Sequence, residues 1–231
     1  MTAPADHPLY YLAADVRELD RLAIQEHGIP GFTLMQRAGQ AVFDALLAHW
    51  PGVQHLTCFC GGGNNGGDGY VIAALASASG LGVEVVAVGD PASLKGDARL
   101  ASAMAREHQV PVLPLTAFQA RNKASRNTKT VIVDALLGTG LTGPARGDYA
   151  AAIRLINQSG MPVVAVDIPS GLSSDTGEAL GETVKAGLTV TFIGRKLGQI
   201  MIDGPQYCGD LIFDDLGVPE EIYSRISPVT L

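Results

Sequence analysis

The hydrophobic residues of this chain follow two periodicities in turn. Seven short apolar runs, bounded by glycine, proline or aspartate, are typical of buried strands. They lie at residues 56–60, 83–88, 110–115, 130–133, 162–166, 188–193 and 211–215. Helical stretches separate them, including residues 70–75, 94–108 and 150–159. Strands and helices in alternation predict an α/β fold with a mainly parallel sheet and helices on both faces.

Two helical segments precede the first strand. Apolar residues recur at helical spacing between residues 12 and 23, and Gly28 and Pro30 end that helix. A second helix is expected from Thr33 to His49. These two extra N-terminal helices could pack on the sheet or on a partner subunit. Residues 1–8 are expected to form a loose tail, and the basic stretch at 121–129 a solvated surface.

Composition and charge exclude several classes of protein. With 231 residues, 47% of them hydrophobic, the chain can form a single domain, residues 1–231, with a large core. A net charge of −7 disfavours a broad nucleic-acid surface. No apolar run is long enough to span a bilayer, and the N-terminus lacks the order of a signal peptide. We therefore expect a cytoplasmic protein without membrane or nucleic-acid partners, in which Cys58 and Cys60 are small core residues.

A glycine-dense segment, residues 61–69, follows the first strand and precedes an alanine-rich run. This order predicts strand, loop and helix, with loop glycines in backbone conformations that side chains forbid. A helix N-terminus that faces such a loop binds anions, most often phosphate. The G-x-G-x-x-G match within the segment is weak evidence, and a purely permissive tight turn is the alternative. Asn64, Asn65 and Asp68 disfavour a plain turn, because it would not need three polar side chains.

Two acidic residues close later strands. Asp134 follows the run at 130–133 and precedes a second glycine-rich turn, residues 138–144, while Asp167 follows the run at 162–166. The carboxyl ends of parallel strands share one edge of the sheet, so both acids are expected beside residues 61–69. Ligands bind at that edge, where the strand order reverses. A single strand-end acid is more often a capping residue, but two acids beside two glycine-rich turns favour a ligand site.

The oxygen-bearing side chains at this edge suggest a cation. Asn65, Asp134 and Ser170 offer an amide oxygen, a carboxylate and a hydroxyl, without accompanying histidine or cysteine. Oxygen ligands suit a hard cation, and a single carboxylate suits a monovalent ion such as potassium. Asp68 and Asp167 remain as candidate acid–base groups. Ser170 is not in a G-x-S-x-G motif, which disfavours a serine hydrolase.

Six short segments form a specific signature. They are L-M-Q-R-A-G at 34–39, G-N-N-G-G-D-G at 63–69, K-G-D-A at 95–98, D-A-L-L-G-T-G-L at 134–141, D-I-P-S-G-L at 167–172 and T-V-T-F at 189–192. In these segments, and in their order, the chain resembles the NAD(P)HX epimerase family, the YjeF N-terminal-like domain. Gly62 is a departure, since the family usually carries proline there. The resemblance implies a three-layer αβα sandwich with a Rossmann-like sheet, in agreement with the apolar runs.

The resemblance also implies an activity, which is interconversion of the R and S epimers of hydrated NADH and NADPH (NADHX and NADPHX). It implies one potassium ion per subunit on Asn65, Asp134 and Ser170, the set that the oxygen chemistry suggests. It implies substrate binding through Asn64, Asn65, Gly66, Gly67, Asp68, Gly138, Thr139, Gly140, Leu141, Thr142, Gly143, Pro144 and Asp167. The damaged carbon is a hemiaminal, so protonation of its hydroxyl lets the ring nitrogen expel water. Asp167 is the predicted general acid–base, with Asp68 as second choice.

Other functions stay open at this point. The same domain type serves in mRNA-decapping scaffold proteins, so a non-catalytic nucleotide-binding or scaffold module is the alternative. An ordinary NAD-dependent oxidoreductase is disfavoured, because Asp90 lies before Pro91 in a turn. Many bacterial members fuse this domain to an ADP- or ATP-dependent dehydratase, and residues 219–231 would suit a linker to it. We also expect a homodimer, and no residue assigns the preference between NADHX and NADPHX.

Overall fold

The computed structural model describes residues 8–120 and 129–230. The tail expected at 1–8, apart from Pro8, and the basic stretch at 121–129, apart from Lys129, lie outside these residues. No helix among the described residues is long and apolar enough to cross a bilayer. Besides the elements introduced below, the chain forms η1 (Pro91–Ser93), α4 (Gly96–Glu107), α5 (Leu115–Gln119), η2 (Leu197–Gln199), α7 (Gly204–Cys208) and η3 (Glu220–Arg225).

A seven-stranded sheet runs through the middle of the molecule, and every pair of neighbouring strands in it is parallel. In spatial order the strands are β4 (Val112–Pro114), β3 (Gly82–Ala87), β2 (His55–Cys60), β5 (Thr130–Ala135), β6 (Val163–Val166), β7 (Leu188–Phe192) and β9 (Asp210–Asp214). Each strand contains residues of one of the seven apolar runs. The predicted α/β fold with a parallel sheet is therefore confirmed.

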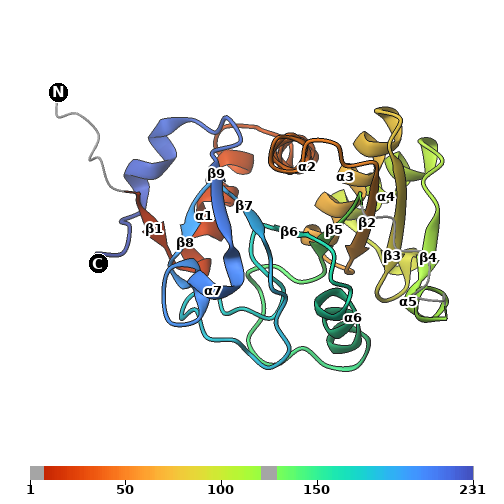
Figure 1. Cartoon of the computed structure of the whole chain (residues 1–231). Coiled ribbons are helices and arrows are strands. Elements are labelled where there is room, and N and C mark those ends of the chain that lie inside the picture. Colours follow the sequence, from red (N-terminus) through yellow and green to blue (C-terminus); the bar gives the residue numbers. More distant parts are fainter. Residues whose placement is uncertain (1–7, 121–128, 231) are drawn as a thin grey trace.

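Side chains of the central strands alternate between two cores. In β2, Leu56, Cys58 and Cys60 belong to the core shared with α2 (Gly31–His49) and α3 (Asn64–Ala78). Phe59 belongs to the core on the other face, with α6 (Gly147–Gln158). Figure 1 shows α2 and α3 on one side of the sheet and α6 on the other. The result is a three-layer αβα sandwich, and the two cysteines are buried core residues with free thiols, as predicted.

The two N-terminal helices pack on their own chain. Helix α1 (Ala13–Gln25) buries Val16, Leu19 and Leu22, and these join the same core as Leu34 and Leu46 of α2. A short strand, β1 (Tyr10–Tyr11), precedes α1 and pairs in parallel with β8 (Arg195–Lys196). Figure 1 shows this pair beside α1, close to the end of the sheet that carries β9. The sequence leaves open whether the two helices pack on the sheet or on a partner subunit, and in the structure their apolar faces pack within their own chain.

The segment after β9 also packs on the N-terminal part of the chain. Ile222 is buried, and the main-chain N–H of Val229 donates a hydrogen bond to the Tyr10 carbonyl (2.8 Å). Arg225 forms an ion pair with Glu26 at the end of α1 (3.1 Å). Whether residues 219–231 lead to a dehydratase domain is not decided by these contacts and stays a prediction.

The glycine-dense segment differs from its prediction. Residues 64–69 are not a loop, because α3 already begins at Asn64, and no glycine from 61 to 69 has a positive φ. Their small size serves close packing instead. A Cβ on Gly66 would collide with the Gly61 carbonyl, and one on Gly69 would lie 2.6 Å from Ala135 Cβ. The glycines therefore let the first turns of α3 lie directly on the sheet.

Candidate active site

The strand order reverses between β2 and β5. From β2 the chain proceeds to β3 and β4 on one side, and it later returns to β5 on the other side of β2. A cavity of about 550 Å³ lies where the segments after these strands meet. Its walls come from α1, α2, the start of α3, residues 136–141 after β5, Asp167 after β6 and the end of β7 with the segment that follows it. Single residues of α4, of α6 and of the segment after β9 complete the lining. This is the edge at which a ligand of a parallel sheet is expected.

Most of the residues predicted to bind substrate line this cavity. They are Asn64, Asn65, Asp68, Gly138, Thr139, Gly140, Leu141 and Asp167. The other five, Gly66, Gly67, Thr142, Gly143 and Pro144, are not among the lining residues, and a role for them in binding stays a prediction. Gly66 and Gly67 are buried, and a Cβ on Gly67 would lie 2.6 Å from the Met35 side chain.

Asp167 follows β6 and is held from several directions. Its Oδ1 atom accepts hydrogen bonds from Lys196 Nζ, Thr191 Oγ1 (3.2 Å) and Phe192 N (3.3 Å). Gln199 Nε2 donates to its main-chain carbonyl (2.8 Å). These contacts offset the cost of a φ of +67°, a left-handed conformation that is uncommon outside glycine and recurs at functional sites. Within the described residues Oδ2 has no partner, so it is free to act on a ligand.

Lys196 is the counter-ion of Asp167. Its side chain is 1% exposed, and its Nζ also donates to Thr191 Oγ1 (3.0 Å) and to the Phe192 carbonyl (3.1 Å). With the bond to Asp167 these use all three ammonium hydrogens. Lys196 therefore serves to position Asp167, and it has no hydrogen left for a ligand.

Three further aspartates, Asp20, Asp68 and Asp97, line the same cavity, and so does Arg17. Burial raises the pKa of Asp68 well above its usual range; the charges of Asp167 and Asp20 raise it further, and Lys196 opposes them. Burial likewise raises the pKa of Asp20 to about 6, with Lys196 lowering it and Asp167 raising it. Asp20, Asp68 and Asp167 thus share the influence of the Lys196 charge, and these three carboxyl groups cannot all be ionised together at low cost.

The residues predicted to bind a cation converge beneath the segment 136–141. Asp134 is fully buried within β5, and its carboxylate accepts hydrogen bonds from Ser170 Oγ (2.6 Å) and Ser170 N (2.8 Å). Asn65 Nδ2 donates to the Leu137 carbonyl (3.1 Å), and Leu137 N donates to Ser170 Oγ (2.9 Å). Burial raises the pKa of Asp134 to about 6 against the lowering effect of these hydrogen bonds.

This oxygen set fits a hard monovalent cation. It combines a carboxylate, a hydroxyl and a main-chain carbonyl oxygen with the Asn65 side-chain amide and carries at most one negative charge, and hard ions prefer oxygen ligands. The described residues contain no group of three or more His, Cys, Asp or Glu side chains that could hold a metal ion. The hydrogen bonds described above bring Asn65, Asp134 and Ser170 close together, as the sequence predicts.

Sequence reasoning did not identify Lys196 and Asp20 as site residues. Asp20 carried a signal, because it interrupts the apolar face of the first helix between Leu19 and Ala23. Lys196 carried a weaker one, four residues past the end of β7, on the same edge as the other strand ends. Tyr149 also lines the cavity, and its hydroxyl accepts a hydrogen bond from Gly62 N (3.2 Å).

Known proteins of similar sequence share this arrangement of segments along the chain. A family model described as YjeF-related protein N-terminus matches residues 31–198. The chain is 46% identical over 219 residues to the bifunctional NAD(P)H-hydrate repair enzyme Nnr of Coxiella burnetii, covering 94% of this chain but 43% of that protein. It is 39% identical over 206 residues to the NAD(P)H-hydrate epimerase of Limosilactobacillus fermentum, covering 89% of this chain and 96% of the relative.

A solved structure shares the fold. The crystal structure of the yeast protein ynu0 (YNL200c) matches with a TM-score of 0.78 over 97% of this chain and 96% of the yeast chain, at 20% sequence identity. At that identity the likeness supports the architecture and carries no argument about chemistry.

Proposed function

The chain belongs to the family described as YjeF-related protein N-terminus, and from that premise we propose that it is an NAD(P)H-hydrate epimerase. This isomerase interconverts the R and S epimers of NADHX and NADPHX, a repair reaction on damaged nicotinamide cofactors. One observation carries the proposal for this site: Asp68 and Asp167, in different electrostatic surroundings, line one cavity at the switch point of the sheet.

The reaction needs acid–base groups near both faces of the nicotinamide ring. The hydrated carbon carries a hydroxyl and neighbours the ring nitrogen. Protonation of the hydroxyl lets the nitrogen lone pair expel water and leaves a planar, cationic carbon. A second water then adds to the opposite face and loses a proton. General acid–base catalysis of such transfers contributes roughly 10²–10⁴-fold.

Asp68 and Asp167 suit these two roles. Asp68 is the group whose pKa is raised, so it keeps a proton that it can donate. Asp167 pairs with Lys196 through Oδ1, and its unpaired Oδ2 can accept a proton from the incoming water. The carboxylate of Asp167 also stabilises the positive charge that develops on the ring. In the reverse direction the two residues exchange roles.

We propose that Asn65, Asp134 and Ser170, with the Leu137 carbonyl, hold one potassium ion per subunit. The support is that Asn65 and Ser170 both contact the Leu137 carbonyl and that Ser170 also donates to the buried Asp134 carboxylate. A bound potassium ion would balance the charge of Asp134 beneath residues 136–141. Those residues form one wall of the cavity, and Asn65 connects that wall to the start of α3.

The remaining expectations also belong to the proposal. We expect a cytoplasmic homodimer that acts with an ADP- or ATP-dependent NAD(P)HX dehydratase, either fused or separate. The support is that the relative from Coxiella burnetii is a bifunctional repair enzyme and that this chain spans 43% of its length.

Proton NMR on one purified epimer of NADHX tests the function. The wild-type protein should interconvert the epimers, faster in potassium than in sodium buffer of equal ionic strength. Asp167→Asn and Asp68→Asn should each lower kcat by roughly 10²-fold or more. Asp44→Asn, an exposed change on α2, is the matched control and should leave the rate unchanged. Wild-type rates in both site variants would refute the assignment of the catalytic pair.

A further inference from the structure

The carboxyl group of Asp20 also faces the cavity and has no role in the mechanism above. Its side chain forms no hydrogen bond or ion pair with the described residues. A surface carboxylate needs no such partner, but Asp20 lies on the cavity-lining face of α1 beside Asp68, Asp167 and Lys196. An unpartnered acid in that position requires an explanation.

Helix α1 places Asp20 by packing tightly on the segment that carries Lys196. Its buried residues on this face include Val16, Leu19 and Ala23. Gly194 permits the close approach, because a Cβ there would lie 3.0 Å from both Val16 Cγ2 and Tyr11 Cδ2. Tyr11 in turn is the strand partner of Lys196. The position of Asp20 is therefore fixed relative to the Asp167–Lys196 pair.

The proposed reaction leaves the enzyme in a different protonation state. Asp68 gives its proton to the leaving hydroxyl, and the C–O bond breaks with its electron pair on the departing water. The incoming water forms the new C–O bond and gives its surplus proton to Asp167. The products are ionised Asp68 and protonated Asp167. Before the enzyme can convert the same epimer again, one proton must return from Asp167 to Asp68.

We propose that Asp20 is the proton relay that returns this proton from Asp167 to Asp68 between turnovers. The inference rests on the epimerase function proposed above. Lys196 cannot serve, because its three hydrogens are committed to Asp167, Thr191 and Phe192. Asp20 has no competing partner, so it can both accept and release a proton. A pKa of about 6 keeps both of its forms accessible near neutral pH.

The charged and titratable groups around Asp20 include Arg17, which lies on α1 itself and lines the same cavity, and groups from four other parts of the chain. Asp68 belongs to α3, Asp167 follows β6, Lys196 ends β8, and Tyr223 lies in η3. Lys196 favours the ionised form of Asp20, whereas Asp167 favours the protonated form. When Asp167 is protonated after a turnover, its raising effect on the pKa of Asp20 is lost, so Lys196 holds Asp20 in the ionised form that can accept the proton.

Asp20→Asn tests the relay, because it removes the titratable group and keeps the side-chain shape. With enzyme in excess, a single conversion of one epimer should proceed within about twofold of the wild-type rate. Steady-state kcat in a dilute, bulky buffer should fall roughly tenfold or more. Imidazole or another small buffer should restore it, since a mobile acid–base pair can carry the proton instead. Glu18→Gln, on the outer face of α1, is the control and should match the wild type in both experiments.

The outcomes separate the relay from the function itself. Unchanged steady-state kcat in Asp20→Asn overturns the relay and leaves the epimerase intact. Equal losses in single-turnover and steady-state rates, without rescue by small buffers, overturn it as well, because Asp20 would then act on the chemical step. If the wild-type protein does not interconvert the epimers at all, the proposed function fails before the relay is reached. Thermal melting of each variant establishes that it is folded.

Discussion

Lys196→Met would test whether this lysine chiefly holds the Asp167 carboxylate. The change keeps a long flexible stem but removes the ammonium group and its three hydrogen bonds. Asp167, whose side chain is only 18% exposed, would keep Thr191 Oγ1 and Phe192 N as donors but lose its counter-ion. The perturbation therefore converts a paired charge in a poorly solvated site into an unpaired one.

Two limits set the size of the expected loss in the free energy of unfolding. Removing one partner of a buried ion pair costs about 3–5 kcal/mol. The carboxyl group can instead take up a proton, which for an aspartate of ordinary pKa, about 3.9, costs about 4 kcal/mol at pH 7 and about 1.5 kcal/mol at pH 5. We expect the free energy of unfolding to fall by about 4 kcal/mol at pH 7 and by about half as much at pH 5.

The sign of this pH dependence follows from linkage. Asp20 and Asp68 already have raised pKa values in the folded chain, and Lys196 lowers both. Removing Lys196 raises these folded-state pKa values further above those of the unfolded chain, so the penalty grows as the pH rises. When the lysine is removed, each of these two carboxylates loses the favourable interaction with the ammonium charge.

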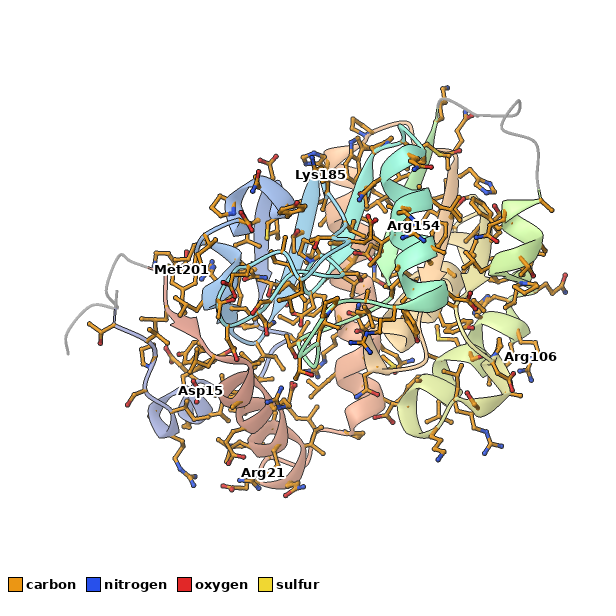
Figure 2. The ribbon with its side chains drawn as sticks, turned by 90° about the horizontal axis from the view of Figure 1, so that it is seen from below. Asp15, Arg21, Arg106, Arg154, Lys185 and Met201 are labelled. Atoms are coloured by element: carbon orange, nitrogen blue, oxygen red, sulfur yellow. The ribbon has the colours of Figure 1, made fainter. Side chains whose placement is uncertain are left out.

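Urea unfolding of the variant between pH 5 and pH 8 measures the effect. Adding Asp167→Asn to Lys196→Met should recover most of the stability lost at pH 7, because the double variant has no charge left to pair. Lys185→Met, at an exposed lysine labelled in Figure 2, should change stability by less than about 0.5 kcal/mol. An equal loss at pH 5 and pH 8 would refute the reasoning, since it would show a role in packing alone.

Two further predictions concern the start of α3 and the cation site. Gly66→Ala should lower the free energy of unfolding in urea by about 2 kcal/mol or more, because its Cβ would meet the Gly61 carbonyl. Gly62→Ala should cost less than about 1 kcal/mol, because its Cβ would lie 3.8 Å from Tyr149 Oη. Equal effects of the two changes would contradict the packing argument. Ser170→Ala should abolish the difference in epimerisation rate between potassium and sodium buffers, and a variant that keeps the difference would exclude Ser170 from the ion site.

The fold could be predicted from the sequence because its signals are local. Each strand of the parallel sheet is a short apolar run, and the connections between strands have helical spacing, so the layers follow from periodicity. The predicted bounds of the strands differ from the observed bounds by one or two residues. The start of α3 was placed too late, because glycine-rich turns and tightly packed glycine-rich helix ends have the same composition, and only the neighbouring backbone distinguishes them.

The candidate site could be predicted only where its residues lie in glycine-rich or acidic segments at the ends of strands. Asn65, Asp134 and Ser170 were expected together, since parallel strands bring their carboxyl ends to one edge, and the structure places them within hydrogen-bonding reach of the same few atoms. Asp20 and Lys196 depend on how α1 and β8 return to that edge. This is tertiary information, which neither periodicity nor strand order contains.

The pairing of β1 with β8 has a consequence for how the protein is made. Tyr10 and Tyr11 are translated long before their strand partners Arg195 and Lys196. Until then the part of the apolar side of α1 that packs on Gly194 stays uncovered, a state in which nascent chains aggregate or recruit chaperones. Closure of the cavity by α1 is therefore a late event in biogenesis, and the polypeptide becomes competent for chemistry only after residues 195–196 have been made.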